Sequence, residues 1–310
     1  MSPDGGVTWI NITARFYDKN GKPRKDIKGA RIPYDRWVVR VVPSAFEENT
    51  CYVAYSGYRT HNEDKTYLFV TRDLGQTFED ISGGLECPVN DLEEDPHNPN
   101  ILYLASDYGL YVTFDQGKNW IKFSSTAPDV IIMDLAIQKR DRDLVIGTYG
   151  RGIYIADIFP LKEFKAENLA REAYLFEPQE VIKWNMFDRR GGTYGEAARA
   201  QNPPVGATLY YYLKTKAEKV NIVIKDIEGK VIQELNGATG QGIQKVFWNL
   251  SLRQAQPAGE RGTFMEPGLA PGRGATVDPG TYLISLVVNG KEVQTRKLVI
   301  SPDPLSRPII

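Results

Sequence analysis

Two groups of side chains in this 310-residue sequence could do chemistry on a ligand. The first is a pair of carboxylates, Asp91 and Asp134, which occupy equivalent positions in two segments offset by 43 residues. Hydrolysis of a glycosidic bond uses two facing carboxylates, one as the acid and the other as the base or nucleophile. A carboxylate at the start of a strand can equally bond the backbone of a neighbouring repeat. Asp91 and Asp134 are therefore catalytic candidates with a structural alternative.

The second group consists of aromatic and charged residues in three predicted loops. One loop is a ten-residue insertion, GYRTHNEDKT, at 57–66. Tyrosines stack on sugar rings, and arginines clamp carboxylates through two parallel hydrogen bonds. An ordinary solvated loop surface with salt bridges is the alternative interpretation. The ligand-binding candidates are Tyr58, Arg59, His61, Asp107, Tyr108, Tyr149 and Arg151.

An eight-residue motif occurs three times between the strands that must position these loops. Its copies are SPDGGVTW from Ser2, TRDLGQTF from Thr71 and TFDQGKNW from Thr113. We predict a tight turn in which the Asp accepts backbone hydrogen bonds, the Gly takes a positive φ and the aromatic residue packs between neighbouring repeats. A carboxylate used in this way is not free for acid–base chemistry. Structural roles are therefore expected for Asp4, Gly6, Trp9, Asp73, Gly75, Phe78, Asp115, Gly117 and Trp120.

The motifs belong to a longer repeat of about 40–45 residues with four short strands per unit, which is typical of β-propeller blades. The segment from Val89 aligns without a gap with the segment from Ile132, and a looser copy starts at Trp37. We expect the end of one blade at 2–14 and further blades at 36–82, 88–123 and 130–158. Because a ring needs about four or more blades, upstream blades of a longer protein or self-association must complete it.

Composition and charge argue against several classes of function. The net charge of −1 gives no electrostatic reason to expect binding to nucleic acid or to a membrane surface. No apolar run approaches the length of a membrane span. The two histidines and two cysteines are too few for a zinc-type cluster, so we expect no metal and no cofactor. Whether Cys51 and Cys87 pair stays open.

A second domain follows the repeats. We interpret 1–158 as the blades, 159–172 as a linker with one short helix, and 173–310 as a β-sandwich. Apolar residues alternate in its predicted strands, as in Leu209, Tyr211 and Leu213, and Asn289-Gly290 reads as a hairpin turn. Several such strands in about 100–130 residues favour an immunoglobulin-like sandwich. The Pro- and Gly-rich segment 254–279 is expected to be a long loop.

Several stretches carry a specific resemblance, among them YLFVTRDLGQTFEDIS, PVNDLEEDPHNPNILYLASDYGLYVTFDQGKNW and DRDLVIGTYGRGIYIADI. They resemble the closing blades of bacterial sortilin-like or neuraminidase-repeat proteins, in which the eight-residue motif is the Asp-box. The stretches QNPPVGATLYYYLK, KVNIVIKDIEGKVI and DPGTYLISL are similar to the sandwich that ends such proteins and to the immunoglobulin-like domain of flagellar hook-capping proteins. The resemblance implies an all-β chain, a partial β-propeller of Asp-box blades followed by an immunoglobulin-like β-sandwich.

The functions implied by this resemblance range from sialidase and xyloglucanase to peptide-binding receptor. Arg31, in Ala-Arg-Ile-Pro, is similar to an arginine element of sialidases, but it follows a motif instead of preceding the first one. We interpret that match as coincidence. We expect a non-catalytic binding or scaffold module of a secreted or periplasmic protein, with a carbohydrate or peptide ligand. The alternative is a glycoside hydrolase whose catalytic residues lie partly in upstream blades, and a third class is a peptide receptor of the sortilin type.

Overall fold

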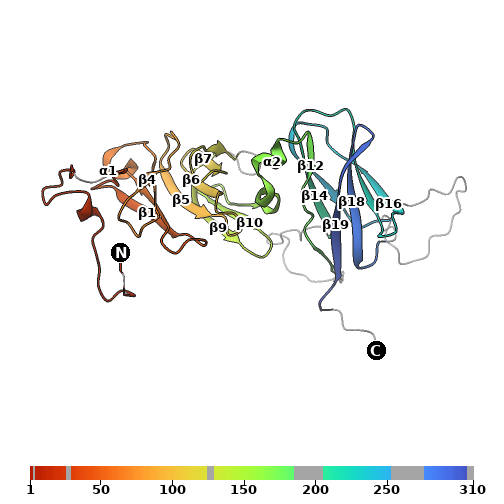
Figure 1. Ribbon diagram of the computed structural model, residues 1–310, viewed down its shortest axis with the longest axis horizontal. Helices are drawn as coiled ribbons and strands as arrows, with labels where there is room; N and C mark the ends of the chain where they lie inside the picture. The colour runs from red at the N-terminus through yellow and green to blue at the C-terminus, as the bar shows by residue number, and fades with distance from the viewer. Residues whose placement is uncertain (3, 26–28, 124–128, 185–204, 253–275, 306–310) are drawn as a thin grey trace, which may run out of the picture. The chain divides into compact units, whose positions relative to one another are not determined.

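The protein is described by a computed structural model of the all-β class, in which strands form most of the regular secondary structure, as expected from the sequence (Figure 1). The residues described are 1–2, 4–25, 29–123, 129–184, 205–252 and 276–305. The chain divides into two compact units, residues 1–162 and 163–310. Most of the loop expected at 254–279 lies outside the described residues.

The first unit contains three antiparallel sheets, each formed by strands that follow one another in the sequence. Their orders are β1-β2-β3-β4, β5-β6-β7-β8 and β11-β10-β9. The strands are β1 (Trp37–Pro43), β2 (Cys51–Ser56), β3 (Tyr67–Thr71), β4 (Glu79–Asp80), β5 (Val89–Glu94), β6 (Leu102–Ser106), β7 (Gly109–Thr113), β8 (Ile121–Lys122), β9 (Ile132–Gln138), β10 (Asp143–Thr148) and β11 (Ile153–Asp157). A 3-10 helix, η1 (Thr13–Arg15), precedes the first sheet, and a one-turn helix, α1 (Tyr58–His61), connects β2 to β3.

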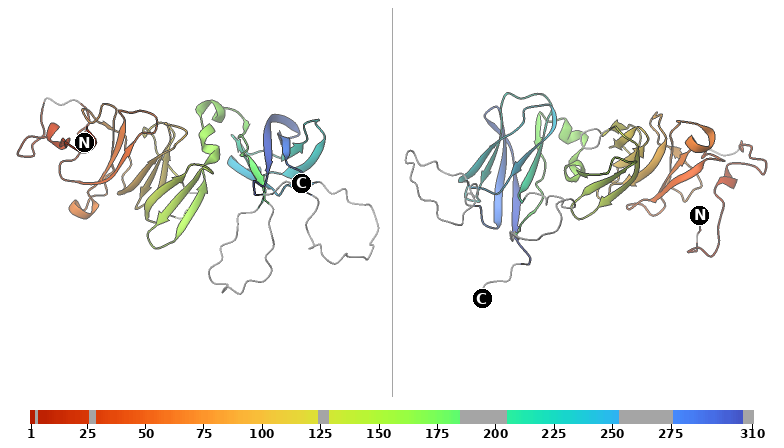
Figure 2. Two further views of the ribbon diagram at one scale, coloured as in Figure 1. Left: turned by 90° about the horizontal axis from the view of Figure 1, so that it is seen from below. Right: turned by 180° about the vertical axis from the view of Figure 1, so that it is seen from behind.

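The three sheets stack face to face along the unit, as the orange-to-green sequence of sheets in Figures 1 and 2 shows. Successive side chains of a strand point to opposite faces. In β2, Tyr52 and Ala54 therefore pack toward the second sheet, while Val53 and Tyr55 pack toward the N-terminal segment. Covering both faces of a strand buries nearly every residue in it, which explains the unbroken apolar runs of β2, β3 and β6.

The N-terminal segment closes the free face of the first sheet. Phe16 and Ile32 are 0% and 1% exposed and pack against Val53, Tyr55 and Phe69. The rings of Phe16 and Phe78 meet edge to face, with centroids 5.6 Å apart. Residues 12–25 and 29–34 thus serve the first sheet as a covering layer.

The three eight-residue motifs form the same turn. In the second copy, Thr77 donates its backbone N–H to Oδ1 of Asp73 at 2.9 Å and its hydroxyl to Oδ2 at 2.6 Å. The hydroxyl of Thr71 donates to Oδ1 at 2.8 Å and accepts the N–H of Gly75 at 2.7 Å. The same four bonds recur around Asp4 and Asp115. Burial raises the pKa of Asp73, but these hydrogen bonds outweigh it and hold the pKa below its ordinary value.

The aromatic residue that ends each motif has a different environment in each copy. Phe78 is 4% exposed within the first core. Trp120 donates its indole N–H to the carbonyl of Ile81 in the preceding sheet at 2.9 Å. Trp9 donates to the carbonyl of Gly6 within its own turn and remains 75% exposed. The second and third motifs therefore tie their sheet to the element before it.

The internal repeat appears in the strand pairing with one difference from the ungapped sequence alignment. The corresponding triplets of paired residues are Leu92–Leu104–Tyr111 in the second sheet and Leu135–Ile146–Tyr154 in the third. The outer members are offset by 43 residues, as expected, but the middle strands are offset by 42. A shorter first loop and a longer second turn compensate each other, so the ungapped alignment conceals the shift.

The second unit consists of two sheets that enclose one core. Their orders are β12-β14-β17 and β13-β19-β18-β15-β16. The strands are β12 (Ala173–Leu175), β13 (Val181–Lys183), β14 (Ala207–Leu213), β15 (Val220–Lys225), β16 (Val231–Asn236), β17 (Gly242–Trp248), β18 (Gly280–Val288) and β19 (Lys291–Pro302). Leu209 and Tyr211 of one sheet share the core with Ile222 and Ile284 of the other, and all four are fully buried. The turn at Asn289-Gly290 has positive φ at both residues, as this hairpin type requires.

The two units are contiguous in sequence, and two short helices lie near the boundary. These are the 3-10 helix η2 (Phe159–Glu163) and the one-turn helix α2 (Ala166–Leu169). Leu161 belongs to a core of the first unit. The carboxylate of Glu163 accepts hydrogen bonds from Tyr174 at 2.5 Å and Arg296 at 3.2 Å in the second unit. Most of the expected linker is therefore built into one unit or the other.

The turn glycines provide a test of sheet stacking. A Cβ on Gly117 would lie 2.7 Å from both Cβ and O of Ile81, whereas a Cβ on Gly84 would meet nothing within 4 Å. Both residues have positive φ, so both alanine variants carry the same kind of backbone strain. We expect Gly117→Ala to lose about 1–3 kcal/mol more stability in urea denaturation than Gly84→Ala, because of the added clash. Equal losses would show that the motif turn at Gly117 does not pack closely against Ile81 of the preceding repeat.

Candidate functional site

A cleft of about 730 Å³ opens on the first unit, where β1, β5 and β9 begin and where the turns between second and third strands lie. These three strands are the first strands of their sheets and neighbour one another. The residues that line the cleft are Trp37, Val38, Val39, Ser56, Tyr58, Arg59, Thr60, Pro88, Val89, Asn90, Asp107, Ile131, Met133 and Tyr149.

The structure brings four of the seven ligand-binding candidates together in this cleft, namely Tyr58, Arg59, Asp107 and Tyr149. Tyr108 instead donates its hydroxyl to Asp64 at 3.0 Å. His61 lies on the same helix as Tyr58, but its Nε2 lies 3.3 Å from a carboxylate oxygen of Asp35. Arg151 is exposed and lies outside the cleft lining.

Trp37, Asn90 and Met133 also line the cleft but are absent from the sequence-based candidates. Trp37 is 68% exposed and Met133 37% exposed, although both lie on strands. In the sequence they look like ordinary apolar strand residues. An exposed tryptophan at the start of a strand is detectable only once burial is known.

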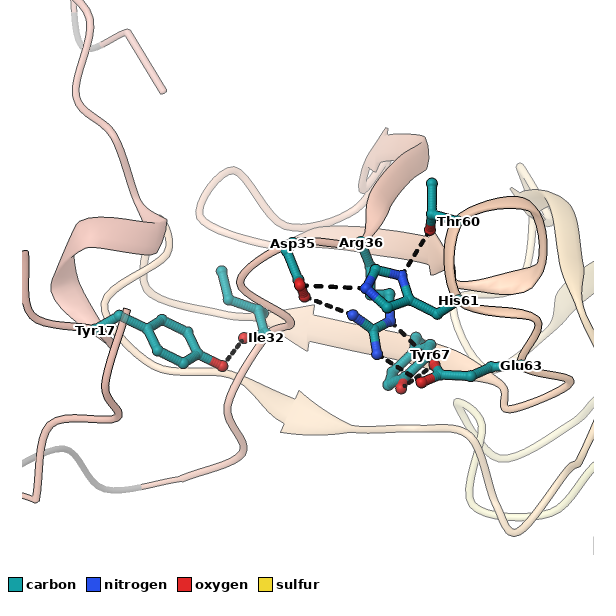
Figure 3. A network of polar contacts seen from close by, with 8 residues as sticks. All are labelled: Tyr17, Ile32, Asp35, Arg36, Thr60, His61, Glu63 and Tyr67. Carbon is teal, nitrogen blue, oxygen red and sulfur yellow. Dashed lines mark hydrogen bonds and ion pairs between the residues drawn. The ribbon is translucent and has the colours of Figure 1, made fainter. Parts of the chain in front are cut away.

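The helix α1 presents three of the cleft residues and is tied down by a polar network (Figure 3). Arg36 donates two hydrogen bonds to the carboxylate of Glu63, from Nε at 3.0 Å and from Nη2 at 2.6 Å. Tyr67 donates to the same carboxylate at 2.9 Å. At the other side, Nε2 of His61 lies 3.3 Å from Asp35, which also pairs with Arg36 at 2.5 Å. The adjacent residues 35 and 36 thus hold α1 from two directions.

Gly57 lets this network pack against the start of α1. A Cβ at this position would lie 2.6 Å from Oε2 of Glu63 and 2.9 Å from Nε of Arg36. The backbone carbonyl of Gly57 accepts the N–H of His61 at 2.8 Å and closes the single turn of α1. Any side chain at this position would therefore displace the Arg36–Glu63 pair.

A second fixed polar group lies at the start of β5. Asn90 donates from Nδ2 to Asp107 at 2.7 Å and to the carbonyl of Ile132 at 2.9 Å. These bonds connect the second sheet to the third and orient Asp107, whose other oxygen accepts no hydrogen bond from the described residues. An oriented carboxylate with a free oxygen can accept ligand hydroxyl groups.

The two catalytic candidates differ sharply in their surroundings. Asp91 is 2% exposed, and its Oδ1 accepts the N–H of Leu92 at 2.8 Å and Nε of Arg40 at 2.9 Å. Its Oδ2 accepts the N–H of Leu135 in the third sheet at 2.8 Å. Asp134 is exposed. Asp91 therefore uses both oxygens as acceptors, whereas Asp134 faces solvent.

Burial raises the pKa of Asp91 to about 6, against the opposing effects of the Leu135 and Leu92 hydrogen bonds and the Arg40 charge. The neighbouring carboxyl of Asp134 adds to the increase. Two neighbouring carboxyls with different environments are the arrangement from which acid and base roles arise. In this case both oxygens of Asp91 are already bonded to protein groups, one to Leu92 and Arg40 and the other to Leu135.

Other classes of site find no support in the described part of the chain. Within it, no group of three or more His, Cys, Asp or Glu side chains could hold a metal ion. Cys51 and Cys87 are free thiols. Arg31 donates to the carbonyl of Arg24 at 3.0 Å and does not line the cleft. No helix among the described residues is long and apolar enough to cross a membrane.

Comparisons with known proteins give only distant similarities. The sequence matches none of the known family profiles and none of the curated proteins. Among solved structures, a GH74 xyloglucanase from Xanthomonas campestris is 15% identical, with a TM-score of 0.33, over 84% of this chain and 38% of that one. CopC from Methylosinus trichosporium OB3b is 12% identical, with a TM-score of 0.22, over 44% of this chain and 99% of CopC. Latent PorU from Porphyromonas gingivalis is 10% identical, with a TM-score of 0.25, over 88% of this chain and 21% of PorU. Similarities of this size do not assign the chain to a family.

The two aspartates provide a matched pair of variants. In Asp91→Asn an amide N–H₂ group must face a backbone N–H or Arg40, so one buried donor loses its acceptor. We expect Asp91→Asn to lower the free energy of unfolding by about 1–3 kcal/mol. The exposed control Asp134→Asn should change it by less than about 0.5 kcal/mol. Chemical denaturation of both variants measures the difference. Equal stabilities would show that the hydrogen bonds of Asp91 do not stabilise the first unit.

Glu63 provides a prediction for pH. The hydrogen bonds from Arg36 and Tyr67 lower the pKa of Glu63 from 4.5 to about 2. A lowered pKa means that the Arg36–Glu63 interaction is fully present above pH 4.5 and is lost as the pH falls through about 2. A carboxyl NMR titration should place the Glu63 midpoint near 2 and move it toward 4.5 in Arg36→Gln, with a smaller rise in Tyr67→Phe. A wild-type midpoint near 4.5 would show that α1 is not held by this pair.

Proposed function

We propose that this chain is a non-catalytic carbohydrate-binding module from an Asp-box β-propeller protein, and that the cleft of the first unit is its binding site. The proposal places the protein in a secreted or periplasmic setting, in line with the family that the sequence resembles. The second unit, as an immunoglobulin-like sandwich, would serve anchoring or assembly.

The observation that carries the proposal is the set of exposed aromatic side chains around fixed polar groups. Trp37, Tyr58 and Tyr149 line the cleft and are 68%, 46% and 71% exposed. An exposed aromatic ring buries apolar surface when the C–H face of a sugar ring stacks on it, and this burial favours binding. Asn90 and Asp107 supply oriented hydrogen-bonding groups beside them. Apolar platforms with a few convergent polar groups are typical of small-molecule sites.

A glycoside hydrolase is the alternative, because Asp91 has a raised pKa and Asp134 lies beside it. The bonds to Asp91 argue against it. A general acid must direct its proton at the leaving-group oxygen, but Asp91 is buried and accepts three hydrogen bonds or ion pairs. We therefore assign Asp91 to holding the sheets together.

The propeller assignment has its own support in the third sheet. Leu110 and Val112 are each 2% exposed, because the third sheet covers them. Their counterparts 43 residues later, Ile153 and Ile155, are 72% and 62% exposed. An apolar face of this kind needs a covering layer. A further blade, from upstream sequence or from a second copy of the chain, would cover it and complete the ring.

Trp37→Ala tests the binding function. Removing one stacking platform should weaken oligosaccharide binding by about 5- to 30-fold, or about 1–2 kcal/mol, in isothermal titration calorimetry. Trp9→Ala is the matched control, since Trp9 is also highly exposed but lies on the first motif outside the cleft lining. It should leave the affinity unchanged.

Three results would contradict the proposal. Equal losses in the two tryptophan variants would show that the cleft is not the binding site. Binding of unstructured peptides with no binding of oligosaccharides would favour a receptor of the sortilin type. Release of sugar from a glycoside, lost in Asp134→Asn, would favour the hydrolase.

A further inference from the structure

We propose that the cleft selects oligosaccharides that carry a carboxylate, and that Arg59 is the residue that makes this selection. The inference rests on the proposed carbohydrate-binding function and adds the chemical class of the ligand. Its basis is a guanidinium that lines the cleft, adjoins an aromatic platform and has no partner among the described residues.

Arg59 differs from the other cations near α1 because it has no bonding partner among the described residues. Arg36 is bound by Glu63 and Asp35. Arg40 pairs with Asp91 and Glu93. The ammonium group of Lys65 lies 5.1 Å from the centroid of the Tyr67 ring. Arg59 is exposed, lines the cleft and forms no hydrogen bond or ion pair within the described residues.

The backbone that carries Arg59 is fixed in advance of binding. The one turn of α1 is closed by hydrogen bonds from His61 to Gly57 at 2.8 Å and from Asn62 to Tyr58 at 3.0 Å. The contacts of Asp35 with His61 and of Arg36 with Glu63 hold the C-terminal end of this turn (Figure 3). A ligand therefore does not have to order the backbone that carries Arg59, which reduces the entropic cost of binding.

Tyr58 and Arg59 together match the two features of a uronic acid, its apolar C–H face and its carboxylate. A sugar ring stacks on an aromatic side chain through its C–H face. The carboxylate of a uronate can accept two parallel hydrogen bonds from a guanidinium. Adjacent residues of one short helix supply both groups.

The remaining charge in the cleft sets the orientation of such a ligand. Asp107 belongs to the turn between β6 and β7 in the neighbouring sheet, and one of its oxygens accepts no hydrogen bond from the described residues. That oxygen accepts sugar hydroxyl groups but repels a carboxylate. The acidic group of the ligand is therefore directed toward α1 and away from the second sheet.

The test is calorimetry on the whole chain with a panel of uronic-acid oligosaccharides and their carboxyl-reduced counterparts, which keep the linkage and lose the charge. Wild type should bind an acidic member about tenfold more tightly than its reduced form at low salt. This ratio should shrink at high salt, because the Arg59 site is exposed and screened. In Arg59→Gln the acidic and the reduced forms should bind equally well, with the affinity for the reduced form unchanged. Arg59→Lys should retain part of the preference for the acidic form.

The outcomes separate this inference from the proposed function. Trp37→Ala should weaken both forms equally and leave the ratio intact. Binding of neutral oligosaccharides with no acidic preference, or an unchanged ratio in Arg59→Gln, overturns the role of Arg59 while the carbohydrate site stands. Failure of wild type to bind any charged or neutral oligosaccharide of the panel overturns both.

Discussion

The first unit depends on the carboxylates of β5, which reach into the sheets on both sides. Asp91 accepts the N–H of Leu135 in the third sheet and pairs with Arg40 in the first. Glu94 accepts hydrogen bonds from Tyr52 and from the backbone of Ala45 in the first-sheet region. A buried charge is tolerated only when it is paired and hydrogen-bonded. The bonds of these acids therefore fix the register between neighbouring sheets. Apolar packing alone would not fix it.

The cleft is a consequence of this stacking. Its lining comes from all three sheets, because β1, β5 and β9 begin at the same face and the turns between second and third strands lie beside them. The bond of Asn90 to the carbonyl of Ile132 connects the second sheet to the third, and its bond to Asp107 lies within the second sheet and its turn. Trp37, Asn90 and Met133 lie on these strands, and Asp107 and Tyr149 lie in the turns between strands. The residues of α1 depend in addition on the Arg36–Glu63 pair.

The same repeat that builds the core also leaves two apolar surfaces uncovered. Trp9 occupies the position at which Phe78 and Trp120 pack against the preceding element, yet it is 75% exposed. Ile155 occupies the position of the buried Val112 and is 62% exposed. Both residues have the type expected for a packed environment.

Local and non-local interactions divide what the sequence determined from what the tertiary structure decided. The motif turns were predictable because every partner of Asp73 lies within four residues of it, and the all-β class followed from the alternation of apolar residues within strands. The loop-bearing face was also predictable, since strand order alone brings Tyr58 and Tyr149 to it. That Asp91 bonds Leu135 and that Trp37 lines the cleft were decided only by sheet stacking. These partners are distant in sequence, so their contact depends on the register and burial of the strands. The sequence alignment does not reveal that register, because differences in loop length compensate for the one-residue shift of the middle strands.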